Sequence, residues 1–194
     1  VKRIRGPKGT KVKLEVIRDG KALNFEIERD QINIPSVKTE VTADNIGVIT
    51  VSRYGEDTVQ LMNQAAQEMK DKNVKGVVLD LRGNPGGLLD AAVGMSSLWL
   101  PKGQTVLQEK RDGKLIRTYG ANGNNILQGV PTVVLIDEGS ASASEITAGA
   151  LRDNGAATII GTKSYGKGSV QEIRKLSNGG VLKVTIARWF TPKG

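Results

Sequence analysis

The sequence predicts an α/β protein in which a partial β-rich segment precedes a layered domain of strands and helices. Two observations support this fold class. Short apolar runs, which are typical of strands buried on both faces of a sheet, recur from Ile46 onward. Segments with apolar residues at helical spacing stand between these runs. Before Ile46 the pattern differs, because polar and apolar residues alternate as in a strand with one exposed face.

A hairpin and a linker are expected before the layered domain. Residues 11–17 and 22–28 alternate polar and apolar, and Asp19-Gly20 between them is a frequent hairpin turn. Residues 31–45 are polar and contain one proline, so we interpret them as a linker. The chain starts without methionine, and we expect it to be a piece of a longer protein.

The layered domain is expected to span residues 46–194. In residues 58–70, for example, apolar side chains recur at helical spacing behind Asp57, a residue type that often caps helices. The expected strands are 46–51, 74–81, 132–136 and 157–160, the helices are 58–70, 88–100 and 142–153, and the hairpins are 104–119 and 169–190.

Two residue types are missing from the chain, and their absence removes several kinds of catalytic site. There is no cysteine and no histidine among the 194 residues. A Ser-His-Asp triad, a cysteine nucleophile and a Cys/His zinc site are therefore excluded. Any acid–base chemistry must use aspartate, glutamate, lysine, tyrosine or groups of the main chain itself.

The charge pattern bears on nucleic-acid binding. Lys and Arg number 28 and Asp and Glu number 20, so the formal net charge is +8. Basic and acidic residues alternate, however, and aromatic residues make up only 4% of the chain. This pattern favours a soluble, mildly basic surface over a nucleic-acid-binding face, so we expect no nucleic-acid partner.

Two turns rich in glycine or serine follow buried strands and precede helices, at residues 83–87 and 139–144. Such turns expose backbone N–H groups beside the positive end of a helix dipole. Two of them together could form an oxyanion hole, although ordinary turn formation also explains each one. The first turn does not fit GxGxxG, and Pro85 in it argues against a dinucleotide-binding loop.

Three serines in the second turn, Ser140, Ser142 and Ser144, are candidate nucleophiles. A serine between a strand and a helix projects from the sheet edge, as in the nucleophile turns of hydrolases. Ser142-x-x-Glu145 is also a capping box for the following helix, and the two roles are compatible. The residues alone do not choose among the three serines.

Without histidine, lysine is the most plausible base for a serine nucleophile. A lysine in water keeps its proton near neutral pH, because its ordinary pKa is ~10.4, and burial lowers that value. Segment 161–168 contains Lys163 and Lys167. The segment nearly matches the phosphate-binding GxxxxGKS/T loop, but Gly168 stands where a metal-binding hydroxyl is required and a strand pattern follows. Nucleotide binding is therefore disfavoured.

Four blocks stand in order along the chain: LDLRGNPGGLL at 79–89, GSASASEITAGAL at 139–151, SYGKGSVQ at 164–171 and ARWFTPKG at 187–194. In this order they resemble the carboxyl-terminal processing peptidases, which are tail-specific serine proteases with a Ser/Lys dyad. The similarity covers most of residues 46–194 and implies a layered β/α protease core of the crotonase/ClpP-like kind. The first 30 residues resemble the second half of a PDZ domain.

The resemblance implies roles for five residues. The nucleophile falls on Ser142 and the general base on Lys167. Gln171 matches the residue that orients the lysine. The oxyanion donors fall on the backbone N–H groups of Gly87 and Ala143. The resemblance thus selects one of the three serines and one of the two lysines.

The resemblance also implies a domain organisation and a function. Residues 1–30 would be the C-terminal half of a PDZ domain, 31–45 a linker, and 46–194 a serine protease core truncated at its C-terminal end. The implied activity is a serine endopeptidase that cleaves protein or peptide substrates near their C-terminus, binds them by their tails and needs no metal or cofactor. An extracytoplasmic location is implied, while membrane association outside this fragment and a homo-oligomer stay open.

Three other functions stay open on the same residues. The first is a non-catalytic peptide- or ligand-binding module on the same fold, with Ser142 acting only as a helix cap. The second is a crotonase-like acyl-CoA enzyme, because that fold also builds oxyanion holes from backbone turns. The third is a basic nucleic-acid binder, which would show strongly salt-dependent binding.

Overall fold

In the computed structural model, residues 3–31 and 34–194 are described, and the chain divides into two compact units. The N-terminal unit, Val1–Ile34, contains an antiparallel hairpin of β1 (Lys11–Arg18) and β2 (Lys21–Glu28). Asp19 and Gly20 join the strands with φ angles of 52° and 73°, as a two-residue turn with positive φ at both positions requires. The predicted hairpin is confirmed.

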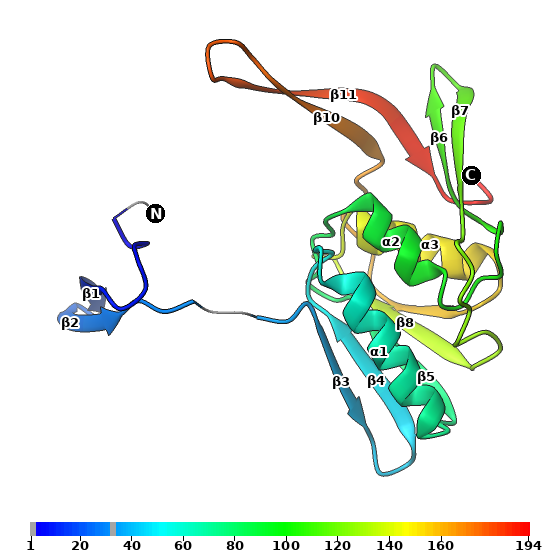
Figure 1. Cartoon of the computed structure of the whole chain (residues 1–194), viewed down its shortest axis with the longest axis horizontal. Coiled ribbons are helices and arrows are strands. Elements are labelled where there is room, and N and C mark those ends of the chain that lie inside the picture. The colour runs from blue at the N-terminus through cyan, green and yellow to red at the C-terminus, as the bar shows by residue number, and fades with distance from the viewer. Residues whose placement is uncertain (1–2, 32–33) are drawn as a thin grey trace. The chain divides into compact units, whose positions relative to one another are not determined.

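The core unit, Pro35–Gly194, contains a five-stranded sheet with the order β3-β4-β5-β8-β9 (Figure 1). Four of its strands run parallel, and each coincides with an apolar run that the sequence predicts as a strand. They are β4 (Ile46–Val51), β5 (Gly76–Asp80), β8 (Thr132–Ile136) and β9 (Thr158–Gly161). The α/β fold class is confirmed.

The fifth strand, β3 (Val37–Val41), lies in the segment that the sequence analysis interprets as a linker. It pairs antiparallel with β4 at the edge of the sheet. An antiparallel edge strand needs only one apolar face, and only Val37 of β3 is fully buried, so its apolar signal is weak. Residues 31–45 are therefore not a continuous linker, and the boundary between the two units falls after Ile34.

Three helices pack against one another and against the sheet through a mainly aliphatic core. They are α1 (Thr58–Asp71), α2 (Leu89–Ser96) and α3 (Ala143–Asp153). α2 ends at Ser96, before the predicted end at residue 100, and the hydroxyls of Ser96 and Ser97 donate to carbonyls one turn earlier. Residues 98–100 stay buried in the turns that follow, which explains why the apolar pattern continues past the helix.

A second sheet of four antiparallel strands lies in the same unit, with the order β10-β11-β6-β7. Its strands are β6 (Thr105–Arg111), β7 (Lys114–Gly120), β10 (Ser169–Lys175) and β11 (Val181–Phe190). Figure 1 shows the β10–β11 hairpin extending away from the helices. Both hairpins are predicted from the sequence and confirmed. Across residues 3–31 and 34–194, no helix has the length and apolar character needed to span a membrane.

The parallel pairing of β5 with β8 determines where the two predicted turns lie. The two strands are direct neighbours, with Leu79 opposite Val134. Their carboxyl ends therefore meet at one edge of the sheet, which is where open α/β sheets usually bind ligands. Turn 83–87 follows β5, turn 139–144 follows β8, and α3 begins directly after the second turn.

Candidate active site

Asp137 joins the two turns at the carboxyl ends of β5 and β8. Its Oδ1 accepts the N–H of Gly83 at 2.7 Å and the N–H of Gly139 at 3.0 Å. These donors, Gly83 above all, hold the pKa of the Asp137 carboxyl below its usual range. Nothing in the sequence pattern distinguishes this residue from an ordinary strand-end aspartate, so it is not among the predicted site residues.

Asn84 connects the turns a second time and is fully buried. Its backbone carbonyl accepts the N–H of Ala141 at 3.0 Å and the hydroxyl of Ser144 at 2.9 Å. Its side-chain amide donates to the carbonyl of Val51 and accepts the N–H of Gly86. The carbonyl thus joins the two turns, while the side chain holds turn 83–87 in shape and against β4. The sequence shows only a turn-forming Asn-Pro here.

Two glycines are required where the turns touch. A Cβ on Gly86 would lie 2.5 Å from the carbonyl oxygen of Ala141 and 2.8 Å from the Cβ of Ser142. A Cβ on Gly87 would lie 2.0 Å from the carbonyl oxygen of Tyr54. Both glycines also have positive φ angles, 92° and 148°, which side chains rarely tolerate. A larger residue at position 86 would push the two turns apart, and one at position 87 would push turn 83–87 away from Tyr54.

The three candidate serines differ sharply in their surroundings. The hydroxyl of Ser140 is buried and donates to the carbonyl of Leu81, and that of Ser144 is buried and donates to Asn84. Ser142 is half-buried and lines a pocket. Its backbone, at φ 54° and ψ −112°, has the strained geometry of a strand-to-helix nucleophile turn. Of the three, Ser142 alone lines this pocket.

All five residues singled out by the sequence line this one pocket, whose volume is about 410 Å³. These residues are Gly87, Ser142, Ala143, Lys167 and Gln171. Apolar side chains from three elements form much of the remaining wall, including Leu107 of β6, Ile146 of α3 and Trp189 of β11. A polar cluster thus opens into a mainly apolar recess, which is the usual composition of a ligand-binding pocket.

The backbone N–H groups of Gly87 and Ala143 have no acceptor among the residues that the structure describes. Ala143 is the first residue of α3, so its N–H points away from the helix, where the helix dipole favours negative charge. The N–H groups on either side of Gly87, those of Gly86 and Leu88, are both occupied. Two free donors therefore flank Ser142, as an oxyanion hole requires.

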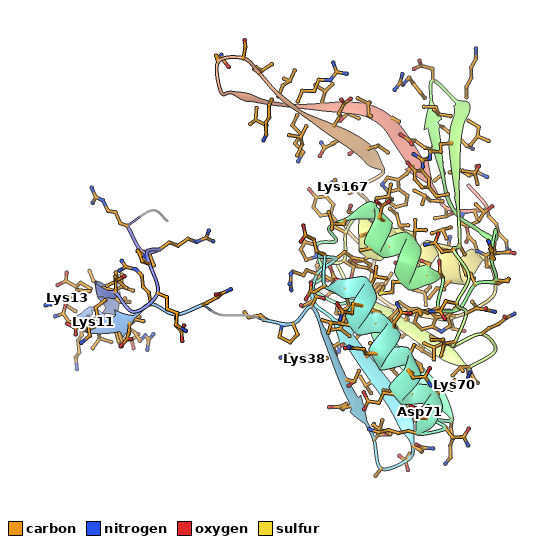
Figure 2. All side chains as sticks on the ribbon, viewed as in Figure 1. Lys11, Lys13, Lys38, Lys70, Asp71 and Lys167 are labelled. Atoms are coloured by element: carbon orange, nitrogen blue, oxygen red, sulfur yellow. The ribbon has the colours of Figure 1, made fainter. Side chains whose placement is uncertain are left out.

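Lys167 is half-buried, whereas Lys163 is exposed. Figure 2 shows Lys167 at the foot of the β10–β11 hairpin. Across the described ranges, Lys167 Nζ forms no hydrogen bond with Ser142 Oγ or with Gln171, and it forms no ion pair. The structure therefore brings the three side chains to one pocket, but Lys167 is not hydrogen-bonded to the other two.

The segment before Lys167 does not have the geometry of a phosphate loop. It leads into strand β10 at Ser169 rather than into a helix, as the sequence predicts. Its N–H groups at Tyr165, Gly166 and Lys167 donate to residues 140 and 145 of the second turn and α3. They are therefore not available to hold a phosphate.

Tyr54 contacts turn 83–87 and α3 without lining the pocket. It is not among the site residues predicted from the sequence. Its backbone exchanges hydrogen bonds with turn 83–87, through the carbonyl of Gly86 and the N–H of Leu88. Its hydroxyl donates to Thr147 of α3 at 3.0 Å, and burial raises the pKa of that hydroxyl. A lone tyrosine after a strand carries no sequence signal for this role.

Comparison with known proteins identifies the family of this chain. Residues 45–194 match the model of peptidase family S41. The chain belongs to peptidase family S41. This match covers the core unit from just before β4 to the end of the chain and includes every residue of the pocket.

Individual relatives of this S41 chain agree with the family match. The carboxy-terminal processing protease CtpA of Bacillus subtilis (strain 168) is 39% identical over 193 residues, which is 98% of this chain and 41% of that protein. The carboxy-terminal-processing protease of Bartonella bacilliformis is 42% identical over 200 residues, covering all of this chain and 46% of that protein. The chain therefore spans less than half the length of these curated relatives.

Among solved structures, the photosystem II D1 C-terminal processing protease is similar with a TM-score of 0.78 and 30% identity. The similarity covers 97% of this chain and 53% of that one. A structure of mature CPAF with lactacystin is similar at a TM-score of 0.63 and 12% identity, which shows a shared fold only. The layered protease core expected from the sequence is thus confirmed.

Proposed function

We propose that this chain contains the catalytic part of a serine endopeptidase that processes protein substrates near their C-terminus. One observation carries the proposal: Ser142, Lys167 and two unoccupied backbone donors line a single pocket, whereas Ser140 and Ser144 are committed to internal hydrogen bonds. The names of the relatives support the class of reaction, since several are carboxy-terminal processing proteases.

The proposed mechanism uses only groups of this chain. The Oγ of Ser142 attacks the substrate carbonyl carbon while its proton passes to the neutral amine of Lys167. The N–H groups of Gly87 and Ala143 stabilise the oxyanion that forms. Lys167 then protonates the leaving amine as the C–N bond breaks, and water hydrolyses the ester. Gln171, which lines the same pocket, would hold the lysine side chain in reach of Ser142.

This mechanism requires a movement from the arrangement in the structure, because Lys167 and Ser142 are not yet hydrogen-bonded. Catalytic hydrogen bonds often form only when substrate binds, so the gap does not argue against the dyad. We propose that substrate entering the apolar recess brings the lysine into reach. The PDZ half in residues 1–30, recognition of substrate tails by it and an extracytoplasmic location are further proposals, and they rest on the family resemblance.

A fluorophosphonate probe tests the proposed function in the full-length protein. The probe should label wild-type protein covalently, because Ser142 Oγ displaces fluoride from phosphorus. S142A should abolish labelling and K167A should slow it at least a hundredfold, while S144A serves as the matched serine control and should still label. Labelling that survives S142A would exclude the serine protease assignment and leave a binding module as the better explanation.

A further inference from the structure

Glu145, at the third position of α3, accepts four hydrogen bonds with one carboxylate. Oε2 accepts the N–H of Ser142 at 2.7 Å and the N–H of Lys167 at 3.1 Å. Oε1 accepts the hydroxyl of Ser164 at 2.8 Å and the N–H of Gly166 at 2.6 Å. A carboxylate has about four acceptor positions, so its capacity is fully used.

Only one of these four bonds belongs to helix capping. The bond from Ser142 is the Glu145 half of the capping box that the sequence predicts, and this box is present. The other three come from residues 164–167, which lie some twenty positions further along the chain. Capping alone therefore does not explain the environment of this side chain.

The segment 162–167 has few other attachments. Tyr165 donates its N–H to the carbonyl of Ser140, and Thr162 donates its N–H to Ile136 and its hydroxyl to Glu138. Gly166 has a positive φ of 84°, and nothing lies within 4 Å of the place where a Cβ would stand. Glycine backbone is intrinsically flexible, and after Lys167 the next anchor is the Gly168 carbonyl, which accepts the N–H of Trp189. Before Lys167, the bonds to Glu145 largely decide where this lysine lies.

We propose that Glu145 is a positioning residue, which fixes the backbone of Lys167 relative to the backbone of Ser142 through a single shared oxygen. This inference rests on the proposed function, since it assigns Lys167 a task that depends on its distance from Ser142. The carboxylate acts on main-chain groups, and among the described residues it forms no ion pair with a lysine or arginine. Glu145 therefore orients the lysine without touching the reacting atoms.

Two substitutions separate this role from capping. Glu145→Gln keeps the size of the side chain but places an NH2 group against two of the donors. Two hydrogen bonds are thereby replaced by repulsive contacts between donors. Glu145→Asp keeps the negative charge at the start of α3, which still favours the helix, but it is one methylene too short to span both segments. Glu138→Gln is the matched control, because Glu138 contacts the same segment only through the Thr162 hydroxyl.

The first measurement is the rate of fluorophosphonate labelling in the full-length protein, with Tm measured on the same samples. E145Q and E145D should label about ten- to a hundredfold more slowly, since one or two charge-assisted bonds are lost. E138Q should label as fast as wild type. A purely structural role for Glu145 would lower Tm without slowing the labelling of the folded protein.

The second measurement is independent of chemistry. Amide hydrogen exchange at Gly166 and Lys167 should accelerate at least tenfold in E145Q and E145D, but not in E138Q. If both Glu145 variants label and exchange as wild type does, the inference is overturned. The proposed function stays intact in that case, provided that S142A and K167A are inactive. Labelling that persists in S142A would overturn both.

Discussion

At the level of single residues, the backbone of Ser142 is the most unusual feature of the chain. A serine at φ 54° and ψ −112° is strained by about 1–3 kcal/mol, and such geometry persists only where surrounding contacts enforce it. Here the bonds from Ala141 and Ser144 to Asn84 hold the flanking residues, and Glu145 holds the N–H of Ser142 itself. Hydrogen bonds of the neighbouring residues thus hold the candidate nucleophile in this strained conformation.

Gly86 offers a direct test of how closely the two turns must approach. G86A should lower the labelling rate at least a hundredfold, because its Cβ would push Ala141 and Ser142 away from turn 83–87. G83A is the matched control: Gly83 also has a positive φ, 67°, but nothing lies within 4 Å of its Cβ position. G83A should therefore cost only about 1 kcal/mol of stability and little activity. Equal labelling rates in the two variants would contradict the close-approach argument.

The residues of the site were only partly predictable from the sequence. Ser142 and Lys167 could be chosen from the family resemblance but not from the residues themselves, because a capping box and a glycine-rich loop each have ordinary explanations. The structure gives a physical basis for choosing Ser142, since Ser140 and Ser144 are buried and donate to main-chain carbonyls. The roles of Asn84 and Tyr54 depend on contacts with distant segments, which no local pattern encodes.

At the level of elements, the hairpins were the most predictable because their turns have a specific chemistry. Asp112-Gly113, like Asp19-Gly20, has positive φ at both positions, which few other residue pairs accept. β3 was missed because an edge strand has little apolar signal, and the end of α2 was misplaced because buried turns prolong the helical pattern. Tertiary contacts decide both features.

Asp153, at the end of α3, binds the segment that follows β11 through a hydrogen bond. Its side chain is only 3% exposed, and its Oδ2 accepts the N–H of Lys193 at 2.9 Å. D153A should lower the free energy of unfolding by about 1.5–3 kcal/mol, the usual cost of losing hydrogen bonds to a charged group. Urea denaturation measures this loss. D71A, at the exposed end of α1 (Figure 2), is the control and should change stability by less than about 0.5 kcal/mol.

Asp137, which joins the turns after β5 and β8, makes the free energy of unfolding depend on pH. Its pKa is lowered in the folded chain, so the unfolded chain takes up a proton at higher pH. The contribution of Asp137 to stability is therefore present above about pH 4 and is lost as pH falls below it. Urea unfolding of wild type and D137N should differ by a constant amount from pH 8 to 5, and the difference should shrink toward pH 3. A difference that stayed constant down to pH 3 would refute this assignment.

At the level of the whole molecule, the two compact units differ in how much apolar surface each buries within itself. The N-terminal unit has one hairpin, and several of its apolar side chains are exposed, including Ile17 at 75% and Ile27 at 47%. A two-stranded hairpin alone is marginally stable in water. Arg29 compensates in part, because its guanidinium bonds to the Ile4 and Lys11 carbonyls.

Amide hydrogen exchange should reveal this difference directly. Amides of β1 and β2 should exchange at least a hundredfold faster than those of β5 and β8, whose strands are buried in the centre of the core sheet. The comparison is best made on this 194-residue chain, where both units are present in one sample. Equal protection of the two units would mean that the hairpin is stabilised by contacts beyond its own residues.

The free donors of Gly87 and Ala143 are main-chain groups, and they do not ionise, oxidise or bind metal ions. The chain as a whole also lacks thiols and imidazoles. A change in redox potential or in zinc concentration should therefore leave the proposed oxyanion site unaltered.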